Sequence, residues 1–348
     1  MDTIKVLITG AGAPGIRGTL YSLKNNWDMR DVVTIGVDMK NEVVGRYLCD
    51  KFYQVPPAES NQFIPALLEI CEKEKVDVIL PQVTAELLPL AEHKKEFEKS
   101  GTKVAVSNYT AIELANNKYK LLKTVRKLNV PYPKFYLVKT WSELEKCAKK
   151  LDTPFVVKPP IASGMRGFRI IYESIDRTEF FFKEKPNNSK ITMEELYSIL
   201  GETFPELLVM EYLPGREYSV DILSSKKEVY VVVPRRRDLI RTGITFVGTV
   251  EKRDDIIEYS TKITRALGLE FAHGLQFKED FKGVPKILES NPRIQGTMVL
   301  STIAGANVIY GAVKLALGEE IPEFSVKWGT KLLRFWGGIG IGDRVIEI

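Results

Sequence analysis

Three polar side chains of different chemistry follow the short apolar segment 287–288. Glu289 offers a carboxylate, Asn291 an amide carbonyl and Arg293 a guanidinium. Carboxylate and carbonyl oxygens are ligands of Mg²⁺, and a guanidinium can bind phosphate oxygens through a pair of hydrogen bonds. In a strand, Glu289 and Asn291 project to the same face because side chains alternate. The spacing predicts a metal site beside a phosphate, although a plain polar turn after a strand has the same pattern.

A third oxygen donor, Gln276, lies in the strand-like segment 271–277. This segment and 284–291 are separated by a short turn, which favours an antiparallel pair. We therefore expect Gln276, Glu289 and Asn291 to form a metal-binding floor, with Arg293 at the reacting end.

Two lysines are placed to bind phosphates. Lys158 ends the strand-like segment 155–158 and precedes a loop of small residues that contains Ser163 and Gly164, before a strand at 169–172. Backbone N–H groups of such a loop can bind phosphate oxygens together with the lysine. An exposed hairpin with a chance lysine is the alternative. Lys118 stands at the start of a basic helix predicted over 116–129 and can reach into a cleft.

Carboxylates and arginines mark two further candidate sites. Glu211 lies near the end of an apolar strand and Glu217 begins the next. This order suits an adenine contact through the backbone between Glu211 and Leu213, with Glu217 at the ribose. Arg235 and Arg237 follow another strand and share a face if the chain is extended, where they could bind a carboxylate or phosphate. A solvated basic edge explains these arginines equally well.

The N-terminus carries a glycine pattern. A strand at 4–8 leads into Gly10-x-Gly12-x-x-Gly15 and a helix that begins near residue 16, and the strand 32–37 ends in Asp38. The pattern is typical of nicotinamide enzymes, so an NAD(P)-dependent oxidoreductase is one interpretation. The same residues can instead form a tight strand-to-helix turn without a dinucleotide.

Strands and helices alternate as far as residue 113, which predicts a doubly wound parallel sheet. Ligands bind such sheets outside the carboxyl ends of the strands, so Gly12, Gly15 and Glu86 are candidate substrate contacts. For Glu86 a purely structural place at the start of a helix is the alternative. Beyond this region the pattern indicates helices at 142–151, 192–200, 254–267 and 296–317. The fold class is α/β, with an α+β C-terminal part.

The composition excludes several classes of protein. A net charge of +5 over 348 residues is too small to indicate nucleic acid as the main partner. The three cysteines lack metal-ligand spacing, which favours a reducing, cytoplasmic setting. The two histidines argue against a histidine-rich zinc site or a Ser-His-Asp triad. We expect neither a membrane span nor a signal peptide, because no apolar run is long enough and the chain enters a strand at once.

The set Lys118, Lys158 with its loop, Glu211, Glu217, Gln276 and Glu289-x-Asn291-Pro292-Arg293 resembles the ATP-grasp superfamily in order and spacing. Within it the chain looks most like the large subunit of carbamoyl-phosphate synthase and single-unit carboxylate–amine ligases. The resemblance implies a domain preceding the grasp at 1–113, a small lobe with a lid at 114–190 and a large lobe at 191–348. In the lid, Ala162-Ser163-Gly164-Met165 departs from the usual Gly-Ser-Gly-Ser core.

The resemblance also implies a reaction and the residues that carry it. Lys118 and Lys158 bind the phosphates of ATP, the loop around Ser163 and Gly164 closes over them, and Arg293 meets an acyl phosphate. Two magnesium (or manganese) ions lie on the oxygen donors. The expected partners are a small carboxylic acid and an amine, and a homodimer is left open. A single grasp unit without a glutaminase domain makes carbamoyl-phosphate synthesis by this chain alone unexpected. A non-catalytic ATP-binding regulatory module is the further alternative.

Overall fold

The computed structural model describes residues 3–162, 164–184, 189–241 and 243–347. The predicted ATP contact Ser163 therefore lies outside the described residues. Contacts along the chain divide it into two units, which we describe separately. Unit 1 takes its residues from 1–116, 218–276 and 290–348, and unit 2 from 117–217 and 277–289.

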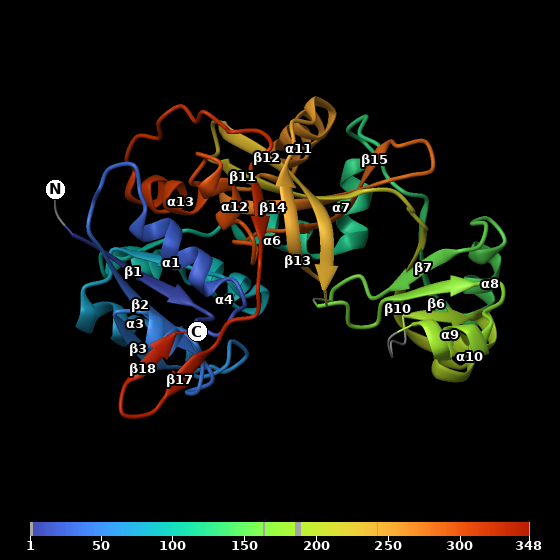
Figure 1. The fold of residues 1–348 in the computed structure, drawn as a ribbon, viewed down its shortest axis with the longest axis horizontal. Helices are drawn as coiled ribbons and strands as arrows, with labels where there is room; N and C mark the ends of the chain where they lie inside the picture. Colours follow the sequence, from blue (N-terminus) through green and yellow to red (C-terminus); the bar gives the residue numbers. More distant parts are fainter. Residues whose placement is uncertain (1–2, 163, 185–188, 242, 348) are drawn as a thin grey trace. The chain divides into compact units, whose positions relative to one another are not determined.

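The first sheet of unit 1 confirms the predicted parallel, doubly wound arrangement (Figure 1). Its described strands have the order β3-β2-β1-β4-β5. The strands are β1 (Ile4–Thr9), β2 (Val32–Asp38), β3 (Lys51–Gln54), β4 (Val78–Leu80) and β5 (Lys103–Val104). The helices between them are α1 (Ile16–Lys24), α2 (Gly45–Leu48), α3 (Phe63–Glu74), the 3-10 helix η1 (Thr84–Glu86), α4 (Leu87–Glu92), α5 (Lys94–Lys99) and α6 (Tyr109–Asn116).

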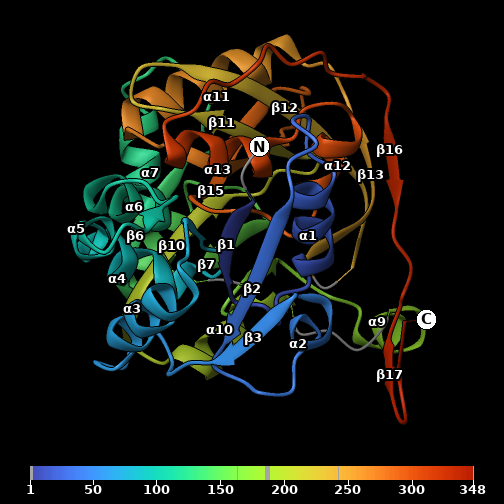
Figure 2. The same cartoon turned by 90° about the vertical axis from the view of Figure 1, so that its left-hand side faces the viewer.

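Side chains that alternate along β1 supply two different cores. Leu7 packs with α3 and α4 on one face of the sheet. Ile4, Val6 and Ile8 pack on the other face with α1 and with the late helix α13 (Val308–Leu317). Figure 2 shows α3 and α4 on one side of the blue strands and α1 on the other. A helix from beyond residue 290 thus covers one face of the first sheet.

A second sheet has the strand order β15-β14-β11-β12-β13-β16, and β11, β12, β13 and β16 pair in antiparallel fashion. Its strands are β11 (Glu217–Ser224), β12 (Val229–Arg241), β13 (Ile244–Val250), β14 (Phe271–Glu279), β15 (Pro285–Asn291) and β16 (Lys331–Leu333). The helix α11 (Asp254–Leu267) lies between β13 and β14 in the chain and has the predicted bounds. Near the C-terminus β17 (Ile339–Ile341) and β18 (Val345–Glu347) form an antiparallel hairpin.

Unit 2 is built on a sheet of order β6-β10-β7-β8-β9. Its strands are β6 (Phe135–Thr140), β7 (Phe155–Lys158), β8 (Arg169–Tyr172), β9 (Lys190–Thr192) and β10 (Thr203–Glu211). Its helices are α7 (Lys118–Val125), α8 (Trp141–Ala148), α9 (Arg177–Lys183) and α10 (Met193–Leu200). Capping boxes start α8 at Thr140 and Glu143, and α10 at Thr192 and Glu195.

One expectation about the elements needs correction. The helix predicted over 296–317 is wrong, because the chain forms α12 (Val299–Ile303) and α13 with a break between them. Gly305 in the break has a φ of 96°, and Asn307 caps α13 by accepting a hydrogen bond from the Tyr310 N–H at 3.0 Å. The division into 1–113, 114–190 and 191–348 stays a prediction. In the contact-based units, residues 191–217 belong to unit 2, where β10 pairs with β6 and β7.

Among the described residues, no helix combines the length and the apolar character that a membrane crossing requires.

Candidate functional site

Two buried lysines and a carboxylate lie close together in unit 2. The Lys118 and Lys158 residues are 7% and 9% exposed. The Lys118 ammonium Nζ donates to the Ala162 carbonyl at 2.9 Å and lies 3.6 Å from Glu289 Oε2. Lys158 occupies the last position of β7, as predicted. The structure therefore brings together three residues that span 171 positions of the chain, from Lys118 to Glu289.

Local sequence explains how these lysines are held. Asn117 starts α7 because its side-chain oxygen accepts from the N–H groups of Tyr119 and Lys120, at 3.0 and 3.1 Å. The Lys118 N–H donates to the Pro160 carbonyl at 2.9 Å. The backbone N–H and the side-chain ammonium of Lys118 thus both donate to carbonyls of the loop that follows β7.

The charges of this site favour an anionic ligand. Burial lowers the pKa of Lys158 to about 8, Glu289 and Glu217 oppose the shift, and Lys118 adds to it. Removal of an ammonium from water is costly unless a partner compensates it. Phosphate oxygens would supply that compensation.

The loop 159–168 joins β7 and β8 as the predicted hairpin, since Phe155 pairs with Ile171 in antiparallel register. Gly164, Met165 and Gly167 have φ values of 65°, 62° and 70°. A Cβ on Gly167 would lie 2.6 Å from Pro159 Cδ, so this turn requires glycine. That the loop closes over phosphates stays a prediction.

The predicted adenine and ribose contacts also lie in unit 2. Glu211 is held by Lys286, whose Nζ donates at 2.7 Å, and by the Lys134 N–H at 3.0 Å. Lys286 further pairs with Asp280 at 3.3 Å. Glu217 lies 4.0 Å from Lys278 Nζ. Leu213 is buried.

Sequence reasoning missed Lys286, because a single lysine in a strand gives no sign of its partner 75 residues away.

The remaining members of the predicted metal set lie in unit 1. Gln276 and Asn291 are half-buried, whereas Glu289 belongs to unit 2. Arg293 donates from Nε to Thr84 Oγ1 at 2.9 Å and from Nη1 to the Ile294 carbonyl at 2.8 Å. Among the described residues no three His, Cys, Asp or Glu side chains form a metal cluster. Carboxylate and amide carbonyl oxygens are donor types that magnesium accepts, and the metal-binding role of these three residues stays a prediction.

Arg235 and Arg237 have contacts within unit 1. Arg235 is 1% exposed, and its Nε lies 2.6 Å from Asp221 Oδ2. It also donates to Thr297 Oγ1 at 2.8 Å. Arg237 donates to Thr245 Oγ1 at 2.9 Å and to the Gly243 carbonyl at 2.6 Å. The structure places Arg235 in the core and gives each arginine a protein partner, and their catalytic role stays a prediction.

The glycine pattern is explained by packing. Gly10 has a φ of 61°, and a Cβ on Gly15 would lie 2.7 Å from Gly296 Cα. The Gly12 N–H donates to Asp38 Oδ2 at 2.8 Å. A dinucleotide phosphate would need this N–H and would meet the Asp38 carboxylate there. Charge repulsion at Gly12 therefore disfavours the nicotinamide interpretation.

Two family models match different parts of the chain. One, described as ATP-grasp in the biosynthetic pathway with Ter operon, matches residues 203–332. The other, described as PylC-like, N-terminal domain, matches residues 6–105. Over residues 203–332 the chain matches the ATP-grasp superfamily. The resemblance inferred from the spaced lysines, carboxylates and Arg293 is confirmed, and with it membership in a family of ATP-dependent ligases.

The chain is distantly similar to carbamoyl phosphate synthase large chains. It is 23% identical to that of Clostridium acetobutylicum over 343 residues, which cover 92% of this chain and 30% of the relative. It is 26% identical to that of a Thermoanaerobacter species over 351 residues, with 93% and 30% covered. The chain thus spans about 30% of the length of these relatives.

Solved structures with the same fold carry nucleotides. A biotin carboxylase from Campylobacter jejuni in complex with β,γ-ATP has a TM-score of 0.69 and 17% identity, covering 92% of this chain and 73% of that one. N5-carboxyaminoimidazole synthetase from Staphylococcus aureus, complexed with ADP, has a TM-score of 0.67 and 17% identity, covering 93% and 80%. At these identities the similarity shows the fold alone.

Proposed function

We propose that the protein is an ATP- and magnesium- (or manganese-) dependent ligase that joins a carboxylic acid to an amine through an acyl phosphate. The observation that carries the proposal is the buried pair Lys118 and Lys158 beside Glu289. Two buried ammonium groups are suited to bind a triphosphate, because Glu289 and Glu217 offset only part of the cost of burying Lys158. The ATP and ADP complexes of proteins with the same fold support this choice.

The reaction proceeds in two transfers. A carboxylate oxygen of the acid attacks the γ-phosphorus of ATP, the bond to the β,γ-bridging oxygen breaks, and ADP leaves. The amine nitrogen then attacks the acyl carbon, phosphate leaves, and the amine loses a proton. Lys118 and Lys158 hold the phosphates and Arg293 meets the acyl phosphate. Such transfers depend mainly on alignment and charge neutralisation, so the scarcity of histidine is no obstacle.

The oxygen donors Gln276, Glu289 and Asn291 would hold the metal ions. A divalent ion there would neutralise charge on the transferring phosphoryl group. Glu289 is the only one of the three with a negative charge, so it contributes most to holding the ion.

The test is a screen of amino acids and small carboxylic acids against amines. We expect ADP, phosphate and product in equal amounts, and only when acid, amine, ATP and Mg²⁺ are all present. Glu289→Gln keeps the size of the side chain but removes its charge. It should lower the rate by orders of magnitude and change nucleotide affinity much less. The matched control is Glu194→Gln, which neutralises an exposed carboxylate of the same unit.

Two results would favour other functions. Tight ATP binding without ADP release across the whole panel indicates the regulatory module. Thermal stabilisation by NADH or NADPH, but not by Mg-ATP, indicates the oxidoreductase. A ligand at 100 times its dissociation constant stabilises a protein by about 2.7 kcal/mol, which separates these cases clearly. A homodimer is also a proposal, tested by sedimentation of the intact chain.

A further inference from the structure

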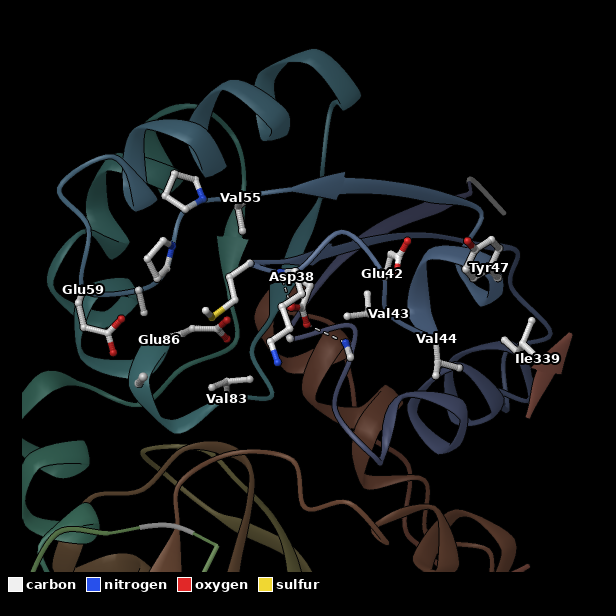
Figure 3. A pocket seen from close by; sticks show the side chains of 18 of the residues that line it. Asp38, Glu42, Val43, Val44, Tyr47, Val55, Glu59, Val83, Glu86 and Ile339 are labelled. Carbon is white, nitrogen blue, oxygen red and sulfur yellow. Dashed lines mark hydrogen bonds between the residues drawn. The ribbon is translucent and has the colours of Figure 1, made fainter. Parts of the chain in front are cut away.

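A cavity of about 710 Å³ lies beside the first sheet of unit 1 (Figure 3). Gly10 and Gly12 of the loop after β1 line it, and so do Val83 and Glu86 after β4. In the order β3-β2-β1-β4-β5, the chain leaves β1 toward β2 on one side, and β4 lies on its other side. The carboxyl ends of strands at such a reversal form the usual ligand crevice of an open α/β sheet.

The lining carries a surplus of negative charge. Asp38, Glu42, Glu59 and Glu86 contribute carboxylates, against the single ammonium of Lys40 among the residues that line the cavity. Figure 3 shows Asp38 and Glu86 between Glu59 and Ile339, which lie toward opposite ends of the view. An anionic ligand such as a dinucleotide is disfavoured here, and a cation is favoured.

Two of these carboxylates are fixed by the fold. Asp38 accepts hydrogen bonds from the N–H groups of Gly12 and Lys40, at 2.8 and 2.9 Å. Glu86 is 9% exposed and accepts a hydrogen bond from the Thr9 hydroxyl. Burial raises the pKa of Glu86 to about 7, and the charge of Asp38 adds to the shift. A ligand cation between them would offset this repulsion and favour the charged form of Glu86.

Apolar side chains complete the wall. They come from the segment around α2 and from the hairpin strand β17: Val43, Val44, Tyr47, Val55, Ile339 and Ile341. A small inorganic cation would gain nothing from this surface. A molecule with an alkyl or aromatic stem would bury it.

We propose that this cavity binds an organic ammonium ion with an apolar stem, whose charged end meets Glu86 and Asp38. The identification of this ammonium compound as the amine substrate of the ligase rests on the proposed function. The binding of the cation itself does not.

Three probes of equal length separate charge from shape. Pentylamine, 1-pentanol and pentanoate share one alkyl stem and differ only in the head group. Titration of the full chain by calorimetry, without ATP, should show saturable binding of pentylamine, weaker binding of pentanol and none of pentanoate or NADH.

Two variants locate the binding. Glu86→Gln keeps an oxygen that can accept from Thr9, and Glu42→Gln changes an exposed side chain of the same cavity. Glu86→Gln should weaken pentylamine roughly tenfold or more, because a charge-assisted contact of ~1.5–3 kcal/mol is lost and ~1.4 kcal/mol corresponds to tenfold. Glu42→Gln should weaken it less. The control Glu69→Gln neutralises an exposed carboxylate on α3, outside the cavity, and should leave the affinity unchanged.

The outcomes separate this inference from the ligase proposal. It is overturned if pentylamine shows no saturable binding, if pentanol or pentanoate binds as tightly, or if Glu86→Gln and Glu42→Gln both bind pentylamine as the natural chain does. None of these results bears on whether the protein releases ADP when acid, amine and ATP are present, so the ligase proposal would still stand. Conversely, pentylamine binding that depends on Glu86, with no ADP release from any acid and amine, supports the cation site and sinks the ligase.

Discussion

Lys158 is a buried lysine of unit 2 whose pKa is lowered by burial. Its ammonium is buried at the end of a strand, and Glu289 and Glu217 only partly offset the cost of burial. A bound phosphate would stabilise the charged form. Burial makes the charged form of Lys158 unfavourable in the free protein. A bound phosphate would relieve that unfavourable free energy and so gain affinity.

Replacement of Lys158 by alanine should weaken ATP binding, by ~1.5–3 kcal/mol for one charge-assisted contact. The natural chain should also lose ATP affinity as the pH rises through about 8, because Lys158 is charged below this pKa and neutral above it. Lys158→Ala should lack this pH dependence. Calorimetric titration between pH 6.5 and ~9.5 measures both effects.

The control is Lys127→Ala, which removes an exposed lysine just beyond α7. Equal ATP affinity and equal pH profiles for the Lys158 variant and the natural chain would show that the loop after β7 is only an exposed hairpin.

At the residue scale, the sequence identified candidate residues by type and position better than it identified the residues that each of them contacts. Lys118, Lys158 and Glu289 could be selected from residue type and position, and the structure brings them together. Their roles stay predictions. Lys286 could not be assigned to Glu211, because that ion pair depends on how β15 lies against β10 and not on any local pattern. The ion pair of Arg235 with Asp221 could not be assigned either, because an arginine after a strand gives no sign of a buried partner.

Among the elements, β11 and β12 contain the most deeply buried charges. Asp221 and Arg235 lie opposite Val233 and Ser219 in the antiparallel register, and both side chains are almost completely buried. Ser301 donates to Asp221 at 2.5 Å and Gln295 accepts from Arg235 at 3.0 Å. A pair with this many hydrogen bonds is costly to break from one side.

Asp221→Asn should therefore destabilise the protein by about 3–5 kcal/mol, because it leaves the Arg235 charge buried without a counter-charge. Urea unfolding of the two proteins measures the difference. Glu258→Gln removes an exposed i,i+4 ion pair with Lys262 in α11 and should cost no more than about 0.5 kcal/mol. Comparable losses for the two variants would contradict the assignment of a buried structural pair.

The elements themselves were largely predictable where hydrophobic periodicity is strong. The bounds of β7, β8 and α11 agree with the sequence, and the parallel order of the first sheet followed from alternating strands and helices. The break at Gly305 was missed because the apolar run on both sides continues with helical spacing. The strand β13 was missed because its partner β12 continues through the polar residues after Pro234, where sequence favours a solvated edge.

On the scale of the whole molecule, one face of the first sheet is covered by residues that lie far along the chain, in α13 and in the segment before α12. The core on one face of β1 joins Ile8 and Leu20 with Met298, Ile309 and residues around them. Gly15 of the N-terminal pattern reflects the same packing, because it lies against Gly296. The resemblance implied a domain at 1–113. Periodicity reveals the apolar face of its sheet but not how distant the segment is that covers that face.

We expect a fragment of residues 1–116 to fail as an independent domain. It would expose the face of β1 and α1 that α13 covers in the full chain, and exposed apolar surface of this size promotes aggregation. Thermal unfolding and sedimentation of the fragment measure this.

The matched control is residues 1–338, which lacks only the chain from β17 onward and retains α13. A monomeric 1–116 fragment that unfolds cooperatively would contradict the expectation.

The dependence of β1 on α13 also sets a timetable for synthesis. About 200 residues separate the end of the first sheet from the start of α13. At ~5–20 residues per second, a ribosome needs roughly 10 to 40 seconds to make them. Unit 2 has all of its residues once position 289 has emerged, while unit 1 still waits for its last segment. Throughout this interval the nascent chain carries an uncovered apolar sheet face, so holding chaperones and the rate of translation should govern how much of the protein reaches its folded state.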